Sequence, residues 1–343
     1  MKRLKLFLAA TLTLSIMFFS CSKDSNGNNN DGGGSVTTIN LQNSTYTGTA
    51  LVTFADGSNA TGNFKSGTMK LPLQGAKIIA GIQPENQNYI LLGRKQGGII
   101  DLNYNNGQLQ FRIPINGVIP IGSYAEFRLI NTKLNSSYKL EADLDFMNLE
   151  WTPIKGPRPF AVNELNFDGQ NHEISNLKIS KADIFFPWDC RRTYSSGGGP
   201  IGPTYSTWDL YVTGLFATIN SLKNLIIRSG NITAISTKWD ESFTGAFVGY
   251  GGSIENCINY ANVQGDEPPH DNYDCMPADS DYTGGIAGFN YEGQIKNCIN
   301  YGTITNGCGI CTYGGGVEDV SLFRGDNGGK NGNINYGKTS GCP

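Results

Sequence analysis

Histidine and charged residues are both scarce in this chain of 343 residues. The two histidines, His172 and His270, lie in different parts of the sequence, which excludes the H-E-x-x-H motif of zinc peptidases. A catalytic triad of serine, histidine and aspartate is disfavoured as well, because only two histidines could serve as its base. Charged residues make up 16% of the chain, with 26 basic against 29 acidic side chains, so no cationic surface for nucleic acid is expected.

Apolar runs long enough to span a membrane are lacking as well. The N-terminal run, Leu6–Phe19, has fourteen residues, whereas a helix needs roughly 20 to cross a bilayer. Because this run follows a basic N-terminus, it predicts a signal peptide over residues 1–20. Ser20 and Cys21 resemble the lipobox of bacterial lipoproteins, and the resemblance implies that Cys21 carries the lipid after cleavage.

Residues 21–35 are rich in serine, asparagine, glycine and aspartate, which predicts a flexible tether. Phe18 and Phe19 depart from the commonest lipobox residues, so an ordinary secretory signal is the alternative. The tether is similar to the leader of surface lipoproteins from Bacteroidetes. That likeness implies an exported protein, lipid-anchored at the outer membrane or cell surface, with the face of the membrane left open.

The abundance of glycine, with 45 residues, and of aromatic residues, at 11%, favours a turn-rich β protein. Within residues 36–118, Asn106-Gly107 and Asp56-Gly57 each separate two alternating segments, which is the signal of a β-hairpin. We therefore predict a small antiparallel sandwich or sheet here. This segment carries no motif with recognisable chemistry, and its role is left open.

Residues 119–343 carry a different pattern. Ser123 and Glu126 have the spacing of a capping box and predict one short helix. Thr-Gly pairs recur at Thr244 and Thr283, each followed by an Ile-x-Asn-Cys-Ile-Asn-Tyr segment, and such units bury a core only by stacking. The predicted fold class is all-β: a right-handed parallel β-helix with a short N-terminal capping helix, preceded by the antiparallel subdomain.

The segments Tyr124–Phe127 and Phe167–Gly169, followed by the units at 244–257 and 283–298, resemble GLUG-repeat proteins in order and spacing. The unit at 213–227 departs from the repeat because it lacks the second glycine. Members of this family are bacterial surface proteins, including adhesin-like lipoproteins and non-catalytic parts of immunoglobulin A peptidases. The resemblance implies a fold and a cell-surface setting, and it brings no catalytic residue with it.

Four connections between repeat units vary in length: 181–212, 234–243, 265–282 and 306–312. Insertions at one register of a solenoid project from one side, and long aromatic loops on a rigid scaffold are typical of binding sites. Packing of the rings against the scaffold is the alternative. The predicted ligand-binding residues on this loop face are Trp188, Arg191, Arg192, Tyr194, Tyr205, Trp208, Trp239 and His270.

Cys257 and Cys298 occupy the same place in adjacent units, so they should point inward, either as free thiols, which we favour, or as a disulfide. In an exported protein we expect the remaining cysteines to cross-link loops, in a pairing that is left open; they are Cys190, Cys275, Cys308, Cys311 and Cys342. The acidic loop 266–281 lacks the spacing of an EF-hand. We therefore predict neither a metal site nor a cofactor.

The sequence favours a non-enzymatic binding or adhesion module of the cell surface over two alternatives. Its expected ligand is a glycan or an extracellular protein, its contact with membranes is through the lipid anchor, and it has no nucleic-acid partner. One alternative is a polysaccharide lyase or hydrolase, for which Asp143, Asp145, Asp168 and Glu173 are candidates by residue type alone. The other is a structural subunit of a surface assembly. Because no paired-carboxylate motif is found, we predict no catalytic residues.

Overall fold

A computed structural model describes most of the chain from residue 35 onward. The described residues are 35–73, 77–96, 98–105, 108–155, 164–180, 185–192, 204–234, 241–265, 281–290, 293–307, 311–314 and 332–340. They all belong to one compact unit, Ser35–Pro343.

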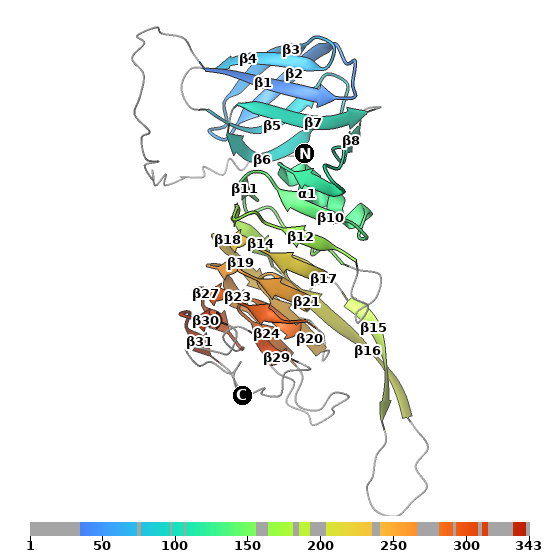
Figure 1. The fold of residues 1–343 in the computed structure, drawn as a ribbon, viewed down its shortest axis with the longest axis vertical. Helices are drawn as coiled ribbons and strands as arrows, with labels where there is room; N and C mark the ends of the chain where they lie inside the picture. Colours follow the sequence, from blue (N-terminus) through green and yellow to red (C-terminus); the bar gives the residue numbers. More distant parts are fainter. Residues whose placement is uncertain are drawn as a thin grey trace, which may run out of the picture. The chain divides into compact units, whose positions relative to one another are not determined.

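Eight strands between residues 35 and 110 form two four-stranded sheets, with strand orders β4-β1-β7-β8 and β3-β2-β5-β6 (Figure 1). Alternate residues of β4 are buried, as expected for a strand with one face on a core. The buried faces share one hydrophobic cluster, which includes Ile39, Val52 and Ile82. The bounds are β1 (Ser35–Gln42), β2 (Gly48–Phe54), β3 (Asn59–Phe64), β4 (Thr68–Leu73), β5 (Ile78–Pro84), β6 (Ile90–Gln96), β7 (Ile99–Asn105) and β8 (Gln108–Gln110).

The first of these sheets is mixed, which corrects the predicted antiparallel subdomain. Strands β1 and β7 run parallel, with Thr38 opposite Ile99 and Gln42 opposite Asn103. Hairpin signals report pairing between strands that follow each other in the chain, whereas a parallel pair needs a long connection. The sequence pattern therefore contained no sign of the β1–β7 pairing.

One short helix, α1 (Tyr124–Leu129), follows these sheets and continues into a 3-10 turn, η1 (Ile130–Thr132). The Ser123 hydroxyl accepts a hydrogen bond from the Glu126 N–H at 3.2 Å, and the Glu126 carboxylate accepts one from the Gly122 N–H at 2.8 Å. The Phe127 ring is fully buried, 5.5 Å from the Trp151 ring. Capping and burial together explain why so short a helix forms.

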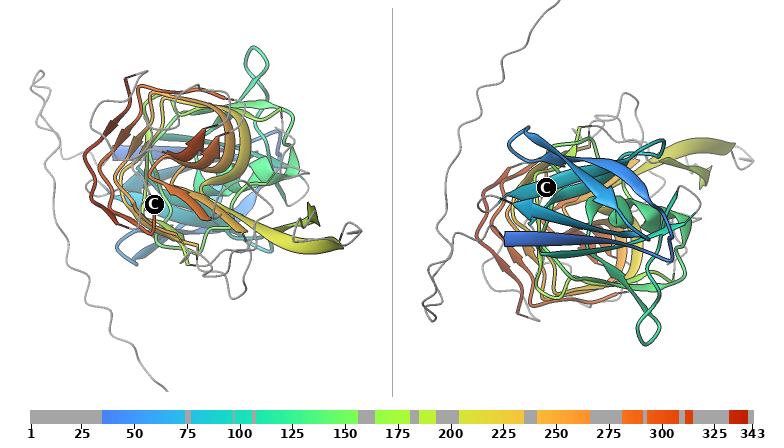
Figure 2. Two further views of the ribbon diagram at one scale, coloured as in Figure 1. Left: turned by 90° about the horizontal axis from the view of Figure 1, so that it is seen from below. Right: turned by 90° about the horizontal axis from the view of Figure 1, so that it is seen from above.

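The repeat units pair strand by strand in three parallel sheets, which Figure 2 views from two ends. The first contains β9 (Val118–Ile121), β10 (Ser137–Leu140), β12 (Asn166–Asp168), β17 (Phe216–Lys223), β21 (Val248–Glu255), β25 (Ala287–Asn290) and β29 (Cys311–Gly314), with β26 (Ile295–Lys296) also on β21. The second contains β11 (Leu144–Asp145), β13 (Glu173–Ser175), β18 (Ile226–Ile227), β22 (Ile258–Asn259), β27 (Ile299–Asn300) and β30 (Ile334–Asn335). The third contains β14 (Leu177–Ile179), β19 (Gly230–Thr233), β23 (Asn262–Gln264), β28 (Ile304–Thr305) and β31 (Thr339–Ser340).

The predicted single right-handed parallel β-helix is wrong, because the described strands divide into several separate sheets, parallel and antiparallel. The clearest departure is a further sheet of order β15-β16-β20-β24, which begins with an antiparallel pair. Its strands are β15 (Phe185–Arg192), β16 (Thr204–Thr213), β20 (Glu241–Gly245) and β24 (Asp281–Gly284). The segments of β15 and β16 are rich in aromatic residues and threonine, which suit strands, although we predicted them as loop.

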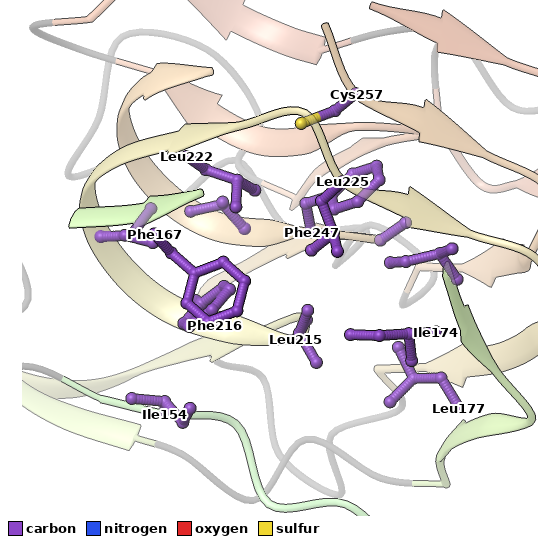
Figure 3. Packing of buried hydrophobic residues seen from close by; sticks show 14 of the residues in the cluster. Ile154, Phe167, Ile174, Leu177, Leu215, Phe216, Leu222, Leu225, Phe247 and Cys257 are labelled. Atoms are coloured by element: carbon purple, nitrogen blue, oxygen red, sulfur yellow. The ribbon is translucent and has the colours of Figure 1, made fainter. Parts of the chain in front are cut away.

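The core of the three parallel sheets is one hydrophobic cluster that runs from Ile119 to Cys298. Figure 3 shows Phe167, Phe216 and Phe247 among the side chains packed within it. Cys257 and Cys298 are both free thiols with no exposed surface. Burial raises the pKa of the Cys257 thiol well above its usual value, so it stays protonated and acts as a small apolar side chain.

Two ladders of asparagine side chains tie neighbouring units together. At one recurring corner, before the buried Leu225, Cys257 and Cys298, the residues Asn224, Asn256 and Asn297 adopt left-handed backbone angles, with φ of 53°, 53° and 50°. Their amides form a chain of hydrogen bonds, from Asn297 to Asn256 at 3.3 Å and from Asn256 to Asn224 at 3.1 Å. Asparagine tolerates this conformation better than most residues, which explains its recurrence at this corner.

The second ladder is buried. Asn259 donates to Asn300 at 2.8 Å, and Asn300 donates to Asn335 at 2.8 Å. Each amide also binds the carbonyl oxygen two residues further along its own chain segment, as Asn300 does with Gly302 at 2.9 Å. Buried amides are costly when unsatisfied, so each unit depends on its neighbour to satisfy its asparagine.

Candidate functional site

The structure places five of the predicted binding residues on strands. Trp188, Arg191 and Arg192 belong to β15, and Tyr205 and Trp208 belong to β16. Trp188 lies opposite Trp208 in the antiparallel pair, and Arg191 lies opposite Tyr205. This pairing brings the five residues onto one two-stranded ribbon.

Four of the predicted lipidation and ligand-binding residues lie outside the described residues. They are the predicted lipidation site Cys21 and the predicted ligand-binding residues Tyr194, Trp239 and His270. Among the described residues, no helix has the length and apolar character needed to cross a bilayer. In that same part of the chain, no three His, Cys, Asp or Glu side chains gather closely enough to hold a metal ion.

The carboxylates considered for catalysis are engaged with their neighbours. Asp145 accepts from the Asn176 amide at 2.8 Å and lies 3.2 Å from the Arg94 guanidinium, and Glu173 pairs with Arg228. Partial burial favours a raised pKa for Asp168, but hydrogen bonds, chiefly from Asn224, outweigh this effect and lower the pKa. A general acid in a glycoside hydrolase needs a raised pKa, so Asp168 does not fit that role.

The fourth of these carboxylates, that of Asp143, lies 3.0 Å from His172 Nδ1 and accepts from the Glu173 N–H at 2.9 Å. The Asp143 side chain is 69% exposed. We interpret this contact as a surface hydrogen bond.

Three exposed tyrosines form a stack on the second parallel sheet. The Tyr260 and Tyr301 rings lie 4.7 Å apart, the Tyr301 and Tyr336 rings lie 5.1 Å apart, and both pairs are nearly parallel. The Arg228 guanidinium lies 4.7 Å from the centre of the Tyr260 ring. Since each ring covers a face of the next, the stack bridges successive units, and Tyr336 at its end is the most exposed of the three rings.

A cavity of about 470 Å³ lies between the N-terminal sheets and helix α1, and this volume is typical of a small-ligand site. We call it the tyrosine groove because three tyrosines line it: Tyr89, Tyr104 and Tyr124. The remaining described lining residues are Asn88, Ile90, Leu91, Gln108, Leu109, Ala125, Arg128 and Leu129. The groove therefore combines an apolar lining with a small number of polar side chains.

The tyrosine groove has a buried floor and an exposed polar rim. Tyr104 and Tyr124 are each 3% exposed, whereas Tyr89 is 43% exposed. Asn88 and Gln108 are also exposed. The Tyr104 hydroxyl lies 3.1 Å from Gln87 Oε1, and burial raises the pKa of both Tyr104 and Tyr124, so the two phenols stay neutral.

Close backbone packing fixes the walls of this groove. A β-carbon at Gly81 would lie 2.0 Å from the Tyr89 hydroxyl oxygen. The Tyr89 ring therefore occupies the space that the side chain of any other residue at position 81 would need. Gly93 has a φ of +72°, and a β-carbon there would lie 2.8 Å from the Tyr124 β-carbon and 2.9 Å from the Asp145 carbonyl oxygen. Glycine at this position lets β6 approach α1 closely.

Buried charges hold α1 in place beside the groove. Arg112 donates to Glu126 at 2.8 Å through Nε and to Glu141 at 2.8 Å through a terminal nitrogen. The Glu126 side chain is 1% exposed. Removing one partner of such a pair would leave a buried charge without a partner. The three charged side chains of Arg112, Glu126 and Glu141 therefore fix the orientation of the helix.

Sequence reasoning missed the tyrosine groove. The exposed Tyr89, which follows the turn after β5, was not singled out from the sequence. Arg128 was part of the predicted helix but was given no role. An exposed aromatic residue directly after a polar turn is the one local signal of this site.

No protein-family model matches the chain, and no curated protein matches it significantly. Among solved structures, the chain is similar to a crystal structure from Bacteroides ovatus named as a putative immunoglobulin A1 protease. The two are 18% identical over 57% of this chain and 61% of that chain, with a TM-score of 0.34. The chain thus matches under two thirds of that protein's length, and a likeness at this level assigns neither fold nor function.

Proposed function

We propose that this protein is a non-enzymatic binding protein of the cell surface that holds a glycan in the tyrosine groove. The observation that carries the proposal is the groove itself, in which the exposed Tyr89 ring and a polar rim occur together with a buried floor in one cavity. Sugar rings present apolar C–H faces that pack on aromatic rings, and their hydroxyl groups need paired donors and acceptors.

The lining favours binding without chemistry. Its polar members in the described part of the chain are the Asn88 and Gln108 amides, the tyrosine hydroxyls and Arg128. None of these is a carboxylate or a histidine, the side chains that most often transfer protons in glycoside cleavage. The candidate carboxylates Asp143, Asp145, Asp168 and Glu173 are absent from the lining.

The setting that we propose is a lipid anchor at Cys21, followed by the tether 21–35, on the outer membrane or cell surface. The basic N-terminus, the short apolar run and the cysteine after Ser20 support it. The resemblance to GLUG-repeat proteins supports the same setting and stays a prediction.

Replacing Tyr89 with alanine should weaken glycan binding about tenfold or more, because an exposed ring that anchors a ligand is a typical hot spot. The measurement is a glycan array probed with wild-type protein and Y89A, followed by titration calorimetry on the best ligand. Mass spectrometry of the same wells would detect cleaved products.

The matched control is Tyr336→Ala, which removes another exposed tyrosine, 61% accessible, outside the groove. A second comparison uses Trp188→Ala and Trp208→Ala on the β15–β16 ribbon. Binding that survives Y89A but is lost in the tryptophan variants would move the site to the ribbon. Product formation in the wells would contradict a non-enzymatic role.

A further inference from the structure

Arg128 is the one charged side chain among the described lining residues of the tyrosine groove. It lies in the last turn of α1 and is exposed to solvent. No ion pair to Arg128 is present in the described part of the chain. The groove therefore has a cation at its rim that no carboxylate of its own lining neutralises.

The neighbouring acidic groups are directed elsewhere. Glu126, two residues earlier on the same helix, is buried and bound to Arg112, Gly122 and Ser123. Glu141 is paired with Arg112 and Lys139. Arg112 and Lys139 thus compensate both carboxylates, which leaves the charge of Arg128 available to a ligand.

The whole chain has the opposite charge balance. Its formal net charge is −3, so a general attraction for anions is not expected. The exposed Arg128 guanidinium, in a groove of otherwise neutral side chains, would therefore attract anions at this one place. Its planar fork of donors matches carboxylate and sulfate oxygens, which can accept two parallel hydrogen bonds.

We propose that the ligand of the tyrosine groove is an acidic glycan, with a carboxylate or sulfate group held by Arg128. The sugar ring that carries the acid lies against Tyr89, and the exposed Asn88 and Gln108 side chains bind its hydroxyl groups. This inference rests on the proposed glycan-binding function and specifies the class of sugar. A position near the end of α1 also suits an arginine for helix stability alone, so the test needs a binding readout.

The experiment compares three matched oligosaccharides: one with a uronic acid, the same one after reduction of its carboxyl group, and a sulfated form. The dissociation constant of the wild-type protein should be about tenfold lower, or lower still, for the two acidic forms than for the neutral form. The reason is that hydrogen bonds to charged groups contribute more to affinity than hydrogen bonds between neutral groups. Raising the salt concentration should weaken acidic binding more than neutral binding. The carboxylated and sulfated arms show which anion is preferred.

Arg128→Gln should abolish the preference for the acidic forms and leave the weaker neutral binding unchanged. Lys133→Gln is the matched control, because it removes one exposed positive charge close in sequence but outside the groove lining. Equal acidic preference in R128Q and wild type would overturn the inference, as would an equal loss in K133Q.

Tyr89→Ala separates this inference from the proposal on which it rests. If Y89A weakens binding of all three oligosaccharides while R128Q changes nothing, the glycan site stands and the acidic preference is refuted. If Y89A leaves binding of all three unchanged, the groove is not the glycan site, and the inference falls with it. Circular dichroism of each variant confirms that the comparison is between folded proteins.

Discussion

Replacing Asn300 with aspartate should lower the free energy of unfolding by roughly 3–5 kcal/mol, the range for a buried charge without a partner. Asn300 has no exposed surface, and its amide nitrogen donates to the Gly302 carbonyl at 2.9 Å and to Asn335 Oδ1 at 2.8 Å. A carboxylate oxygen in that place would face two acceptors with no donor. A protonated carboxyl could satisfy one of them at most.

Urea unfolding followed by circular dichroism measures this effect. The matched control is Asn297→Asp, which makes the same substitution on the exposed ladder, where the Asn297 amide donates to Asn256 at 3.3 Å. Aspartate also tolerates the left-handed backbone of that position, so the control should change stability by about 1 kcal/mol or less. Equal losses of unfolding free energy in the two variants would show that the buried ladder contributes no more to stability than the exposed one.

Replacing Gly245 with alanine should cost about 3 kcal/mol, at the upper end of the usual cost of overpacking. Gly245 belongs to the Thr-Gly pair of a repeat unit, and its backbone lies against the next unit. A β-carbon there would lie 2.3 Å from the Val248 carbonyl oxygen and 2.6 Å from the Ala287 α-carbon. Both atoms belong to paired strands, so neither can move without breaking a sheet.

Gly48→Ala is the control for this substitution. Its β-carbon would meet the Tyr46 hydroxyl oxygen at 2.7 Å, which is the far end of a flexible side chain. Thermal unfolding should therefore show a large fall in the midpoint temperature for G245A and a small one for G48A. A small fall in both would contradict the close backbone packing between units.

The repeat made part of the fold predictable from sequence. The segment Asn256-Cys-Ile-Asn-Tyr260 alternates as a strand should, with Cys257 and Asn259 buried and Tyr260 exposed. The periodic Asn-Cys pair predicted that Cys257 and Cys298 would point inward. Burial of Asn259 was not predictable from the segment alone, because asparagine inside a core needs partners that only the next unit supplies.

Long-range pairing explains the parts that were predicted wrongly. The β1–β7 pair joins segments about 60 residues apart, as in the pairing of Thr38 with Ile99. The β15–β16 ribbon was read as loop because its length interrupted the repeat. Local patterns report which residues can form a strand, but they do not report which other strand will accept its hydrogen bonds.

The tyrosine groove was unpredictable for a related reason. Its described lining comes from three parts of the chain: Asn88–Leu91, then Tyr104 with Gln108 and Leu109, and then four residues of α1. None of these segments carries a recognisable motif. The site exists only because β6, β7 and α1 pack together, and local sequence does not report that packing. The helix itself followed from the capping box, but the role of Arg128 depends on the cavity beside it.

Hydrogen–deuterium exchange with and without the best glycan is the most direct test of the central claim. If the tyrosine groove binds the glycan, exchange should slow in Asn88–Leu91, in Gln108-Leu109 and in Tyr124–Leu129, with little change in β15 and β16. Slower exchange in β15 and β16 alone, with no change around the groove, would contradict the claim and place the ligand on the β15–β16 ribbon.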